Sequence, residues 1–255
     1  MKAHQRLIRE REAALEPRDT ASLIGCEVIR VDRDFARDII LRYEWLGTLN
    51  NVAVAYYGLV DPLGTPLGVS CFGLGSGTKS RDVCGDAWAK RTIILERGAC
   101  VHFAHPHAGS FLTSAAVRMC AADFGYRVFL AYSDPAAGEI GTIYQACNWL
   151  YLGASNGRPA NSWRWEGRRI GTTAWINSRS LRNHARAEGY ADTSLWWPVA
   201  RASGAWEFRR AYDRARYVTF QGTKAEKKEA RAALRYPVQE YPKRQLEPVD
   251  TLDWT

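Results

Sequence analysis

The sequence predicts a mixed α/β domain in which one β-sheet is flanked by helices. Two β-rich runs, 52–60 and 67–72, are separated only by turn-forming residues, so we expect them to form an antiparallel hairpin. The later β-rich runs are linked through segments with helical spacing of apolar residues, so they can pair in parallel. In chain order the elements are β-α-β-β-β-α-β-α-β, an order that favours a single mixed sheet.

The N-terminal elements have recognisable boundaries. Residues 1–20 predict a charged helix or arm, and residues 24–31 predict the first strand. Asp32 is suited to cap the next helix, in which apolar residues recur at helical spacing as far as Tyr43. Gly47 suits the end of that helix, because glycine readily adopts the left-handed conformation found there.

The later elements follow a glycine-containing loop over residues 73–90. We expect a strand over 91–101, a helix over 110–123, a strand over 127–133, a short helix over 141–149 and a strand over 150–154.

The C-terminal third has a different composition. Residues 155–222 are rich in Arg and Trp and predict a less regular structure, with a strand only near its end at 217–220. A helix over 223–235 alternates basic and acidic residues, which is typical of an ordinary charged face. The predicted organisation is an arm (1–20), a single domain (21–240) with an Arg/Trp-rich elaboration (158–222), and an extended tail (241–255).

Composition limits the class of protein. Of the 255 residues, 46% are hydrophobic and 24% are charged, which excludes wholesale disorder. No apolar run is long enough to span a membrane, and no secretory signal follows the first charged residues. The 35 Lys and Arg exceed the 27 Asp and Glu, giving a net charge of +8. This surplus favours a polyanionic partner, with nucleic acid first, and simple solubility is the alternative.

The six cysteines are scattered, and no Cys-x-x-Cys pair occurs. This spacing argues against a zinc ribbon or finger. We therefore expect reduced thiols in a cytoplasmic protein.

Two clusters of residues invite a functional interpretation. His102, His105 and His107 lie within six residues and can bind iron or zinc, or contact phosphate when protonated. The alternative is that they are solvated loop histidines.

The second cluster is the Arg/Trp-rich segment. Residues 158–186 contain seven arginines against one acid, with tryptophans interleaved. Arginine contacts phosphates and tryptophan stacks on unpaired bases, so this segment suits a protein that grips DNA and extrudes a base. A solvated basic loop over a Trp-containing core is the alternative. The residues proposed to contact DNA are Trp163, Arg164, Arg168 and Arg169.

Several stretches resemble the bacteriophage Mom family. They are RYEWLG (42–47), ERGACV (96–101), Asp134-Pro135 followed by GTIYQACNWLYLG (141–153), and RYVTF with GTK (216–224). The resemblance covers roughly residues 24–240. It implies a GNAT-like acyltransferase fold and a transferase that carbamoylmethylates adenine in double-stranded DNA, shielding phage genomes from restriction. It also implies a cytoplasmic location in a phage-infected bacterial host.

The resemblance directs attention to residues suited to this chemistry. The exocyclic amine of adenine is a poor nucleophile, so a base must take its proton as the new bond forms. Asp134, at a strand end, fits that role, and an Asp-Pro turn is the alternative. Arg97 interrupts an apolar strand, where a charge is costly unless it is paired or faces a ligand. Neighbouring Glu96 points to the opposite face in a regular strand, so it is not the obvious partner.

Further candidates lie on the predicted helices and their ends. Tyr144 can donate a proton, and Gln145 and Asn148 can read a base edge, although Tyr144 and Trp149 also suit a core. By the resemblance, Glu44 and Trp45 stand where the family carries His-Tyr. Glu44 can substitute as a proton acceptor and Trp45 can stack on a base; a surface acid and a core Trp are the alternatives.

The helix start at Ser110 can hold an anion or a carbonyl, or Ser110 can be an ordinary N-cap. The turn before it has a single glycine and lacks the pyrophosphate-cradling pattern of acyl-CoA-using relatives. The sequence therefore leaves the donor of the transferred group unidentified, with acetyl-CoA as one candidate. The alternative functions are a CoA-dependent N-acyltransferase acting on a small molecule, protein or tRNA, and a non-enzymatic DNA-binding module.

Overall fold

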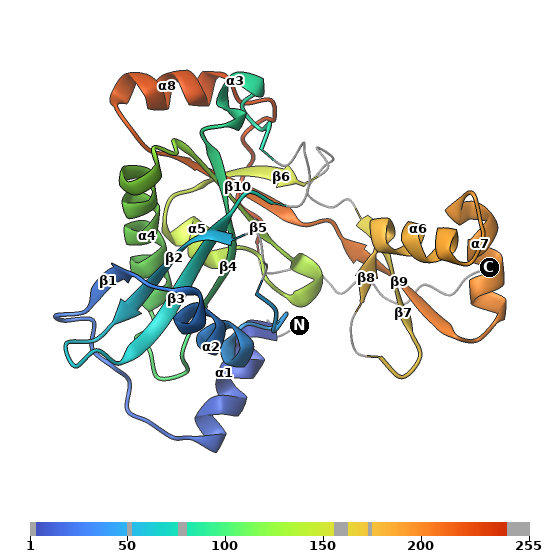
Figure 1. Cartoon of the computed structure of the whole chain (residues 1–255), viewed down its shortest axis with the longest axis horizontal. Coiled ribbons are helices and arrows are strands. Elements are labelled where there is room, and N and C mark those ends of the chain that lie inside the picture. The colour runs from blue at the N-terminus through green and yellow to red at the C-terminus, as the bar shows by residue number, and fades with distance from the viewer. Residues whose placement is uncertain (1–3, 50–52, 76–80, 156–162, 173–174, 244–255) are drawn as a thin grey trace.

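The computed structural model describes residues 4–49, 53–75, 81–155, 163–172 and 175–243. Its centre is a seven-stranded sheet with the order β1-β2-β3-β4-β5-β10-β6 (Figure 1). The strands are β1 (Glu27–Arg30), β2 (Ala53–Val60), β3 (Pro66–Gly73), β4 (Thr92–Cys100), β5 (Val128–Ser133), β6 (Leu150–Ala154) and β10 (Ala215–Phe220). Only β4 and β5 pair in parallel, and the other neighbours are antiparallel. The predicted mixed sheet is therefore confirmed.

The parallel pairing of β4 with β5 is short, and the point where it ends leaves a gap in the sheet. Thr92 to Leu95 pair with Val128 to Ala131, and the pairing ends there. On its other side, β4 has a bulge, because Arg97 lies opposite Cys71 and Leu95 lies opposite Phe72, leaving Glu96 as the extra residue. Beyond this bulge β4 continues alongside β3 alone, and a gap opens between β4 and the end of β5.

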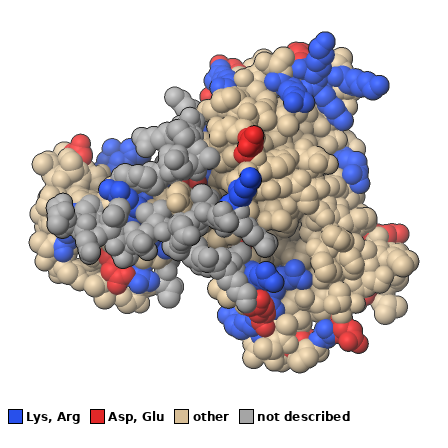
Figure 2. All heavy atoms as spheres, turned by 180° about the vertical axis from the view of Figure 1, so that it is seen from behind, with Lys and Arg blue, Asp and Glu red and all other residues tan. Residues whose placement is uncertain are grey.

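Helices cover both faces of the sheet. One face packs against α2 (Arg33–Tyr43), α4 (Ala108–Phe124) and the short α5 (Thr142–Ala146), around a core that contains Ile40, Leu112 and Phe129. The other face packs against α3 (Asp86–Ala89) and α8 (Lys224–Ala232), around Trp88, Leu130 and Val218. Seen from behind, the surface carries several separate groups of basic side chains (Figure 2).

Most predicted boundaries hold, with local shifts. Asp32 caps α2 as expected, its carboxylate accepting a hydrogen bond from the Phe35 amide at 2.8 Å. The helix ends at Tyr43, before the predicted glycine, because Glu44 turns into an extended conformation. Helix α4 begins at Ala108, so Ser110 lies inside the first turn and is not the N-cap.

The N-terminal arm is a docked helix, α1 (His4–Leu15). Arg9 donates from its guanidinium to the carbonyls of His102 and Ala104, both at 3.1 Å. Arg42 of α2 binds Glu12 at 2.6 Å. These contacts hold α1 beside the end of the sheet where the gap opens. Among the described residues, no helix is both long and apolar enough to cross a membrane.

The Arg/Trp-rich segment is more regular than the sequence predicts. It forms a second, three-stranded sheet with the order β8-β7-β9, inserted between β6 and β10. Two helices pack on this sheet around Leu181, Trp196 and Trp206, and together they form a lobe beside the main sheet (Figure 1). The elements are β7 (Trp163–Arg169), β8 (Ile176–Asn177), α6 (Ser178–Ala187), α7 (Thr193–Ala202) and β9 (Trp206–Tyr212). We call this lobe the insertion.

The chain after α8 returns to the main sheet. Gln239 bridges to Tyr151 of β6, and the Tyr241 hydroxyl donates to the Trp149 carbonyl at 2.9 Å. The start of the predicted tail is therefore anchored, and its remainder, 244–255, lies outside the described residues.

Candidate active site

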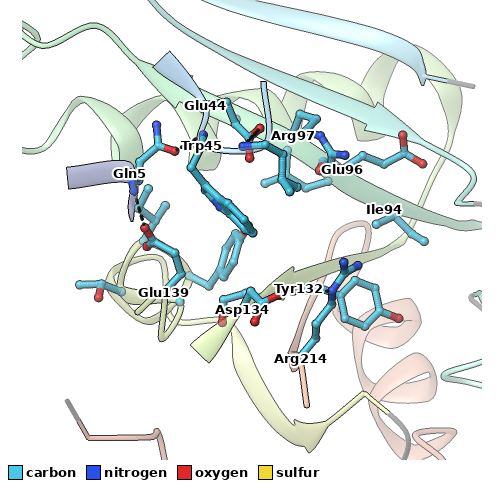
Figure 3. Close-up of a pocket in the computed structure, with 18 of the residues that line it drawn as sticks. Gln5, Glu44, Trp45, Ile94, Glu96, Arg97, Tyr132, Asp134, Glu139 and Arg214 are labelled. Atoms are coloured by element: carbon cyan, nitrogen blue, oxygen red, sulfur yellow. Dashed lines mark hydrogen bonds and ion pairs between the residues drawn. The ribbon is translucent and has the colours of Figure 1, made fainter. Parts of the chain in front are cut away.

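A pocket of about 490 Å³ fills the gap between β4 and the end of β5 (Figure 3). Residues that are distant in the sequence line it: Gln5, Glu44, Trp45, Leu46, Gly75, Ile94, Leu95, Glu96, Arg97, Gly98, Tyr132, Ser133, Asp134, Glu139, Gly141, Thr142, Ile143, Tyr144, Ser155 and Arg214. Five of the residues predicted to act in the site meet here: Glu44, Trp45, Arg97, Asp134 and Tyr144.

The local structure explains why these side chains meet. Glu44 and Trp45 follow the end of α2 in a turn closed by the hydrogen bond from the Gly47 amide to the Glu44 carbonyl. Tyr144 is on α5, which begins after Gly141 in a left-handed conformation. A Cβ at position 141 would collide with the ring of Tyr217, so only glycine brings α5 this close to β10.

The bulge in β4 determines how Arg97 is placed. Because Glu96 is an extra residue, strict alternation breaks and both side chains line the pocket. The Glu96 carboxylate accepts a hydrogen bond from the Gly75 amide at 2.8 Å. Arg97 donates to the carbonyl of Thr48 at 3.0 Å and to that of Glu96 at 2.8 Å. The charge in this apolar strand is thus accommodated at the open edge of the pocket.

Glu44 is a buried carboxyl beside Arg97. Its residue is 8% exposed, and its carboxylate accepts a hydrogen bond from the Leu46 amide at 2.9 Å. Burial raises the pKa of Glu44, and the Arg97 guanidinium opposes this effect. Figure 3 shows the indole of Trp45 extending between Glu44 and Asp134. The predicted alternative of a surface acid at position 44 is therefore wrong.

Asp134 has two roles that the sequence presented as alternatives. Its backbone carbonyl starts the turn η1 (Pro135–Ala137) by accepting from the amides of Ala137 and Glu139. Its side chain lines the pocket, and Oδ2 accepts a hydrogen bond from Arg164 at 3.0 Å.

Arg164 connects the pocket to the insertion. It also donates to Glu166 at 2.7 Å, and Glu166 binds Arg209 of β9 at 2.8 Å. The Arg164 side chain is only 14% exposed, and its partners Asp134 and Glu166 are 12% and 7% exposed. Arg164 therefore holds Asp134 against the insertion, a different role from the predicted contact with DNA.

Tyr144 lies between two other aromatic rings. Its centroid is 5.2 Å from that of Trp149 and 5.2 Å from that of Tyr217. Burial raises the pKa of Tyr144, so its hydroxyl stays protonated at neutral pH. Trp149 is fully buried in the core, as its alternative interpretation predicted. Tyr144 combines both predictions, because it packs on the core and faces the pocket.

The sequence did not indicate Glu139, a second carboxyl with a raised pKa in the pocket. Its Oε1 accepts a hydrogen bond from the Gln5 amide at 3.1 Å, and burial is the main cause of the raised pKa. The only sequence signal is an acid between Gly138 and Gly141, which both adopt left-handed conformations. Tyr132 and Arg214 also line the pocket and were not predicted.

Other predicted residues lie elsewhere. The Ser110 hydroxyl donates to the His107 carbonyl at 3.0 Å. Gln145 donates its amide hydrogens to the carbonyl of Ile140 and to the Tyr217 hydroxyl, so it supports the turn before α5. Its contact with a base edge stays a prediction. Asn148 is exposed beside a different groove, at the opposite end of β10.

The predicted DNA contacts on β7 lie outside the pocket. Arg168 binds Glu207 at 2.6 Å and lies over the Trp175 ring. Arg169 binds Glu188 at 3.5 Å and lies over the Trp206 ring. The backbone of Trp163 pairs with Tyr212, and its side chain lies outside the described part of the structure. A role for these residues in DNA binding stays a prediction.

The predicted metal site at the histidines is wrong. The Nδ1 atom of His102 bonds the Tyr43 hydroxyl at 3.2 Å and its Nε2 atom bonds the Glu16 carbonyl at 2.7 Å, so both ring nitrogens serve the fold. His105 accepts a hydrogen bond from the His107 amide at 3.1 Å. Within the described residues, no group of three or more His, Cys, Asp or Glu is arranged to hold a metal ion.

The comparison with protein families agrees with the resemblance seen in the sequence. The model of the Mom protein family matches residues 26–243. No curated protein matches. Similar solved structures include an IAA acetyltransferase from Bacillus cereus (TM-score 0.40, 11% identity, covering 77% of this chain and 99% of that one). A ribosomal-protein-S5-alanine acetyltransferase from Vibrio fischeri has a TM-score of 0.40 and 8% identity, covering 80% and 97%. A spermidine N-acetyltransferase from Vibrio cholerae has a TM-score of 0.40 and 8% identity, covering 78% and 96%.

The Asp134–Arg164 ion pair should contribute more to the free energy of unfolding than an exposed ion pair of the insertion does. In a double-mutant cycle with Asp134→Asn and Arg164→Met, we expect a coupling energy of about 2 kcal/mol in urea unfolding, because each single change removes one hydrogen-bonded, oppositely charged partner of a mostly buried group. The control cycle, Arg168→Met with Glu207→Gln, joins side chains that are 32% and 43% exposed, and should give less than about 1 kcal/mol. Equal coupling energies in the two cycles would contradict this assignment.

Glu139 should make stability depend on pH. Its pKa in the folded state lies above the ordinary value of 4.5, so the folded protein holds this proton more tightly than the unfolded chain. Stability is therefore lost as pH rises from that value through the raised pKa. Glu139→Gln should be nearly neutral at pH 4 and increasingly stabilising above it, measured by urea unfolding at each pH. Glu27→Gln, on exposed β1, is the control. A stability difference for Glu139→Gln that does not change with pH would show that this carboxyl is not penalised by burial.

Proposed function

Since the chain belongs to the Mom protein family, we propose that it is a DNA-modifying transferase that converts the N6 amine of adenine to its carbamoylmethylated form and so protects phage DNA from restriction. The observation that carries this proposal is the pocket, in which acidic, basic and aromatic side chains from four separate parts of the chain converge. A non-enzymatic DNA-binding module has no need of carboxyls with raised pKa values, and this pocket has two, Glu44 and Glu139.

The pocket suits an adenine turned out of the duplex. Its volume of about 490 Å³ lies within the range typical of small-molecule sites, roughly 300–1,000 Å³. Trp45 provides a flat apolar surface on which a base can stack, and Tyr144 borders the same pocket. The carboxyls of Glu44, Asp134 and Glu139 provide acceptors for the hydrogens of the N6 amine.

Each charged group has a distinct part in the proposed transfer. Asp134, fixed by Arg164, accepts a hydrogen bond from N6 and orients the amine towards the donor carbon. As the bond from N6 to that carbon forms, the bond from the carbon to its leaving group breaks. The N6 proton passes to Glu44, which binds a proton more readily than an ordinary glutamate does. Arg97 and the Tyr144 hydroxyl stabilise the charge that develops on the leaving group.

DNA is the proposed macromolecular partner, and the insertion offers cations for it. Arg182 and Arg186 are exposed and lie one helical turn apart on α6, while Leu181 and Ala185 face the core of the insertion. These two arginines are better placed for phosphate than Arg164, which is occupied by Asp134 and Glu166.

The central test compares nucleosides from DNA modified in cells. We expect bacteria that express the protein to contain deoxyadenosine heavier by a carbamoylmethyl group, detected by mass spectrometry after digestion of their DNA. Asp134→Asn should abolish the modified nucleoside, because the amide cannot anchor Arg164 or accept the N6 hydrogen as a carboxylate does.

The control for this test is Glu207→Gln, which removes an ion pair of the insertion away from the pocket and should leave the modification intact. The proposed function would be overturned if bacteria that express the wild-type protein well contained only unmodified nucleosides in their DNA. Normal modification by Asp134→Asn would overturn the role of this carboxylate.

The donor can be tested separately. The single glycine before Ser110 is Gly109, and a Cβ there would lie 3.1 Å from the Ile143 side chain. This glycine therefore serves the close contact of α4 with α5, and the turn has no further glycine to cradle a pyrophosphate. We expect acetyl-CoA to bind weakly or not at all in calorimetric titration. Micromolar affinity would favour the alternative, a general CoA-dependent acyltransferase.

A further inference from the structure

Helix α8 sorts its charges onto two faces, which the alternating sequence does not suggest. At about 100° per residue, Lys224, Lys227, Lys228 and Arg231 fall within an arc of about 100°. Glu226, Glu229 and the buried Ala230 fall outside that arc. The helix therefore presents a basic stripe and is not the ordinary mixed face that the sequence predicted.

One acidic residue of α8, Glu226, is held by hydrogen bonds to neighbouring elements. Glu226 accepts hydrogen bonds from the Thr223 amide at 2.8 Å and from Arg127 at 3.2 Å, and it also binds Arg91. The Thr223 amide is the main cause that lowers the pKa of Glu226 to about 2, with Arg91 and Arg127 contributing. Lys227, Lys228 and Arg231 form no ion pair with any acidic side chain that the structure describes. Among the described residues, no acidic side chain thus neutralises these three cations.

The stripe forms one wall of a groove of about 400 Å³. Lys227, Lys228 and Arg231 line it on one side, and the floor is made by Leu150, Val218 and Phe220, with Asn148 and Thr219 alongside. A cleft lined by charges of one sign over an apolar floor focuses their field and attracts the opposite charge. Figure 2 shows the cations of α8 as a cluster at the upper right, projecting from the molecule.

The groove and the candidate active site lie toward opposite ends of the paired strands β5 and β10. Strand β10 runs antiparallel to β5, with Ala215 opposite Ser133 and Phe220 opposite Val128. Asp134 follows one end of this pair, and Phe220 lies at the other. Tyr132 and Ile94 line the pocket and also pack in the core beneath α8, so the pocket reaches the face that α8 covers, while Tyr144 enters it from the other face. Six strand residues separate them, which is about 20 Å.

We propose that the α8 groove binds the phosphodiester backbone of the DNA whose adenine enters the pocket. This inference rests on the proposed function, because it takes DNA as the occupant. The distance corresponds to about six nucleotides at about 3.4 Å each, so the groove holds phosphates on the flank of the target adenine. The basic stripe supplies the complementary charge, and Asn148 and Thr219 supply hydrogen-bonding groups to phosphate oxygens.

The test compares two variants of equal charge. Lys227→Glu/Arg231→Glu changes the groove, and Arg37→Glu/Arg118→Glu changes exposed arginines on α2 and α4, which cover the other face of the sheet. Binding of a 24-base-pair duplex with a central adenine is measured by fluorescence anisotropy over a series of KCl concentrations. We expect the groove variant to flatten the slope of log affinity against log salt by about two units, and to weaken binding on the order of tenfold at low salt.

The arginine control should keep the wild-type slope. A duplex of six base pairs centred on the adenine is too short to reach the groove, so the groove variant and the wild type should bind it equally. If the glutamate variant does not fold, Lys227→Gln/Arg231→Gln and Arg37→Gln/Arg118→Gln make the same comparison.

The outcomes separate this inference from the proposed function. A groove variant with the wild-type slope and affinity overturns the inference, even if adenine is modified. A selective loss of slope supports it, even if no modified nucleoside is found. If the wild-type protein does not bind the duplex, the inference is wrong.

Discussion

The structure depends on the point at which β4 and β5 stop pairing. Only Thr92 to Leu95 pair with β5, and the extra residue Glu96 then turns β4 away from it. A continuous sheet would have filled this position with apolar side chains and would have made Arg97 and Asp134 prohibitively costly. Because the strands separate, those charges face a pocket, and the ends of α1, α2 and α5 can approach it. The bulge is thus the local cause of a site assembled from distant segments.

A second constraint ties this pocket to the insertion. Asp134, Arg164, Glu166 and Arg209 form a chain in which negative and positive groups alternate. Alternation allows four mostly buried charges to coexist, since each one has a neighbour of opposite sign. The consequence is that Asp134 of β5 is held by β7, a strand of the other sheet. The insertion therefore contributes to the geometry of the pocket as well as offering a surface to a partner.

The sequence allowed the main sheet to be predicted because its strands are apolar runs separated by clear turns and helices. The Arg/Trp-rich elaboration was predicted, but its second sheet was missed because β7 is rich in Arg and Trp, and its partner β9 follows two helices later. Within the site, Arg97 and Asp134 were found because a charge at a strand position is conspicuous. Glu139 was missed because its environment comes from Gln5, 134 residues away. The histidines were misread because their bonds to Tyr43 and to the Glu16 backbone exist only in the folded chain.

The net charge of +8 does not by itself say where a polyanion binds. In the insertion, Arg164, Arg168, Arg169 and Arg209 are all engaged by glutamates, so the most arginine-rich strand contributes little uncompensated charge. Helix α8 has the opposite arrangement, because Glu226 turns inward to Arg91 and Arg127 while the lysines face the groove. Counterions are released from DNA by cations that have no internal partner. The positions of the acids, more than the number of arginines, therefore determine which surface of this protein is suited to DNA.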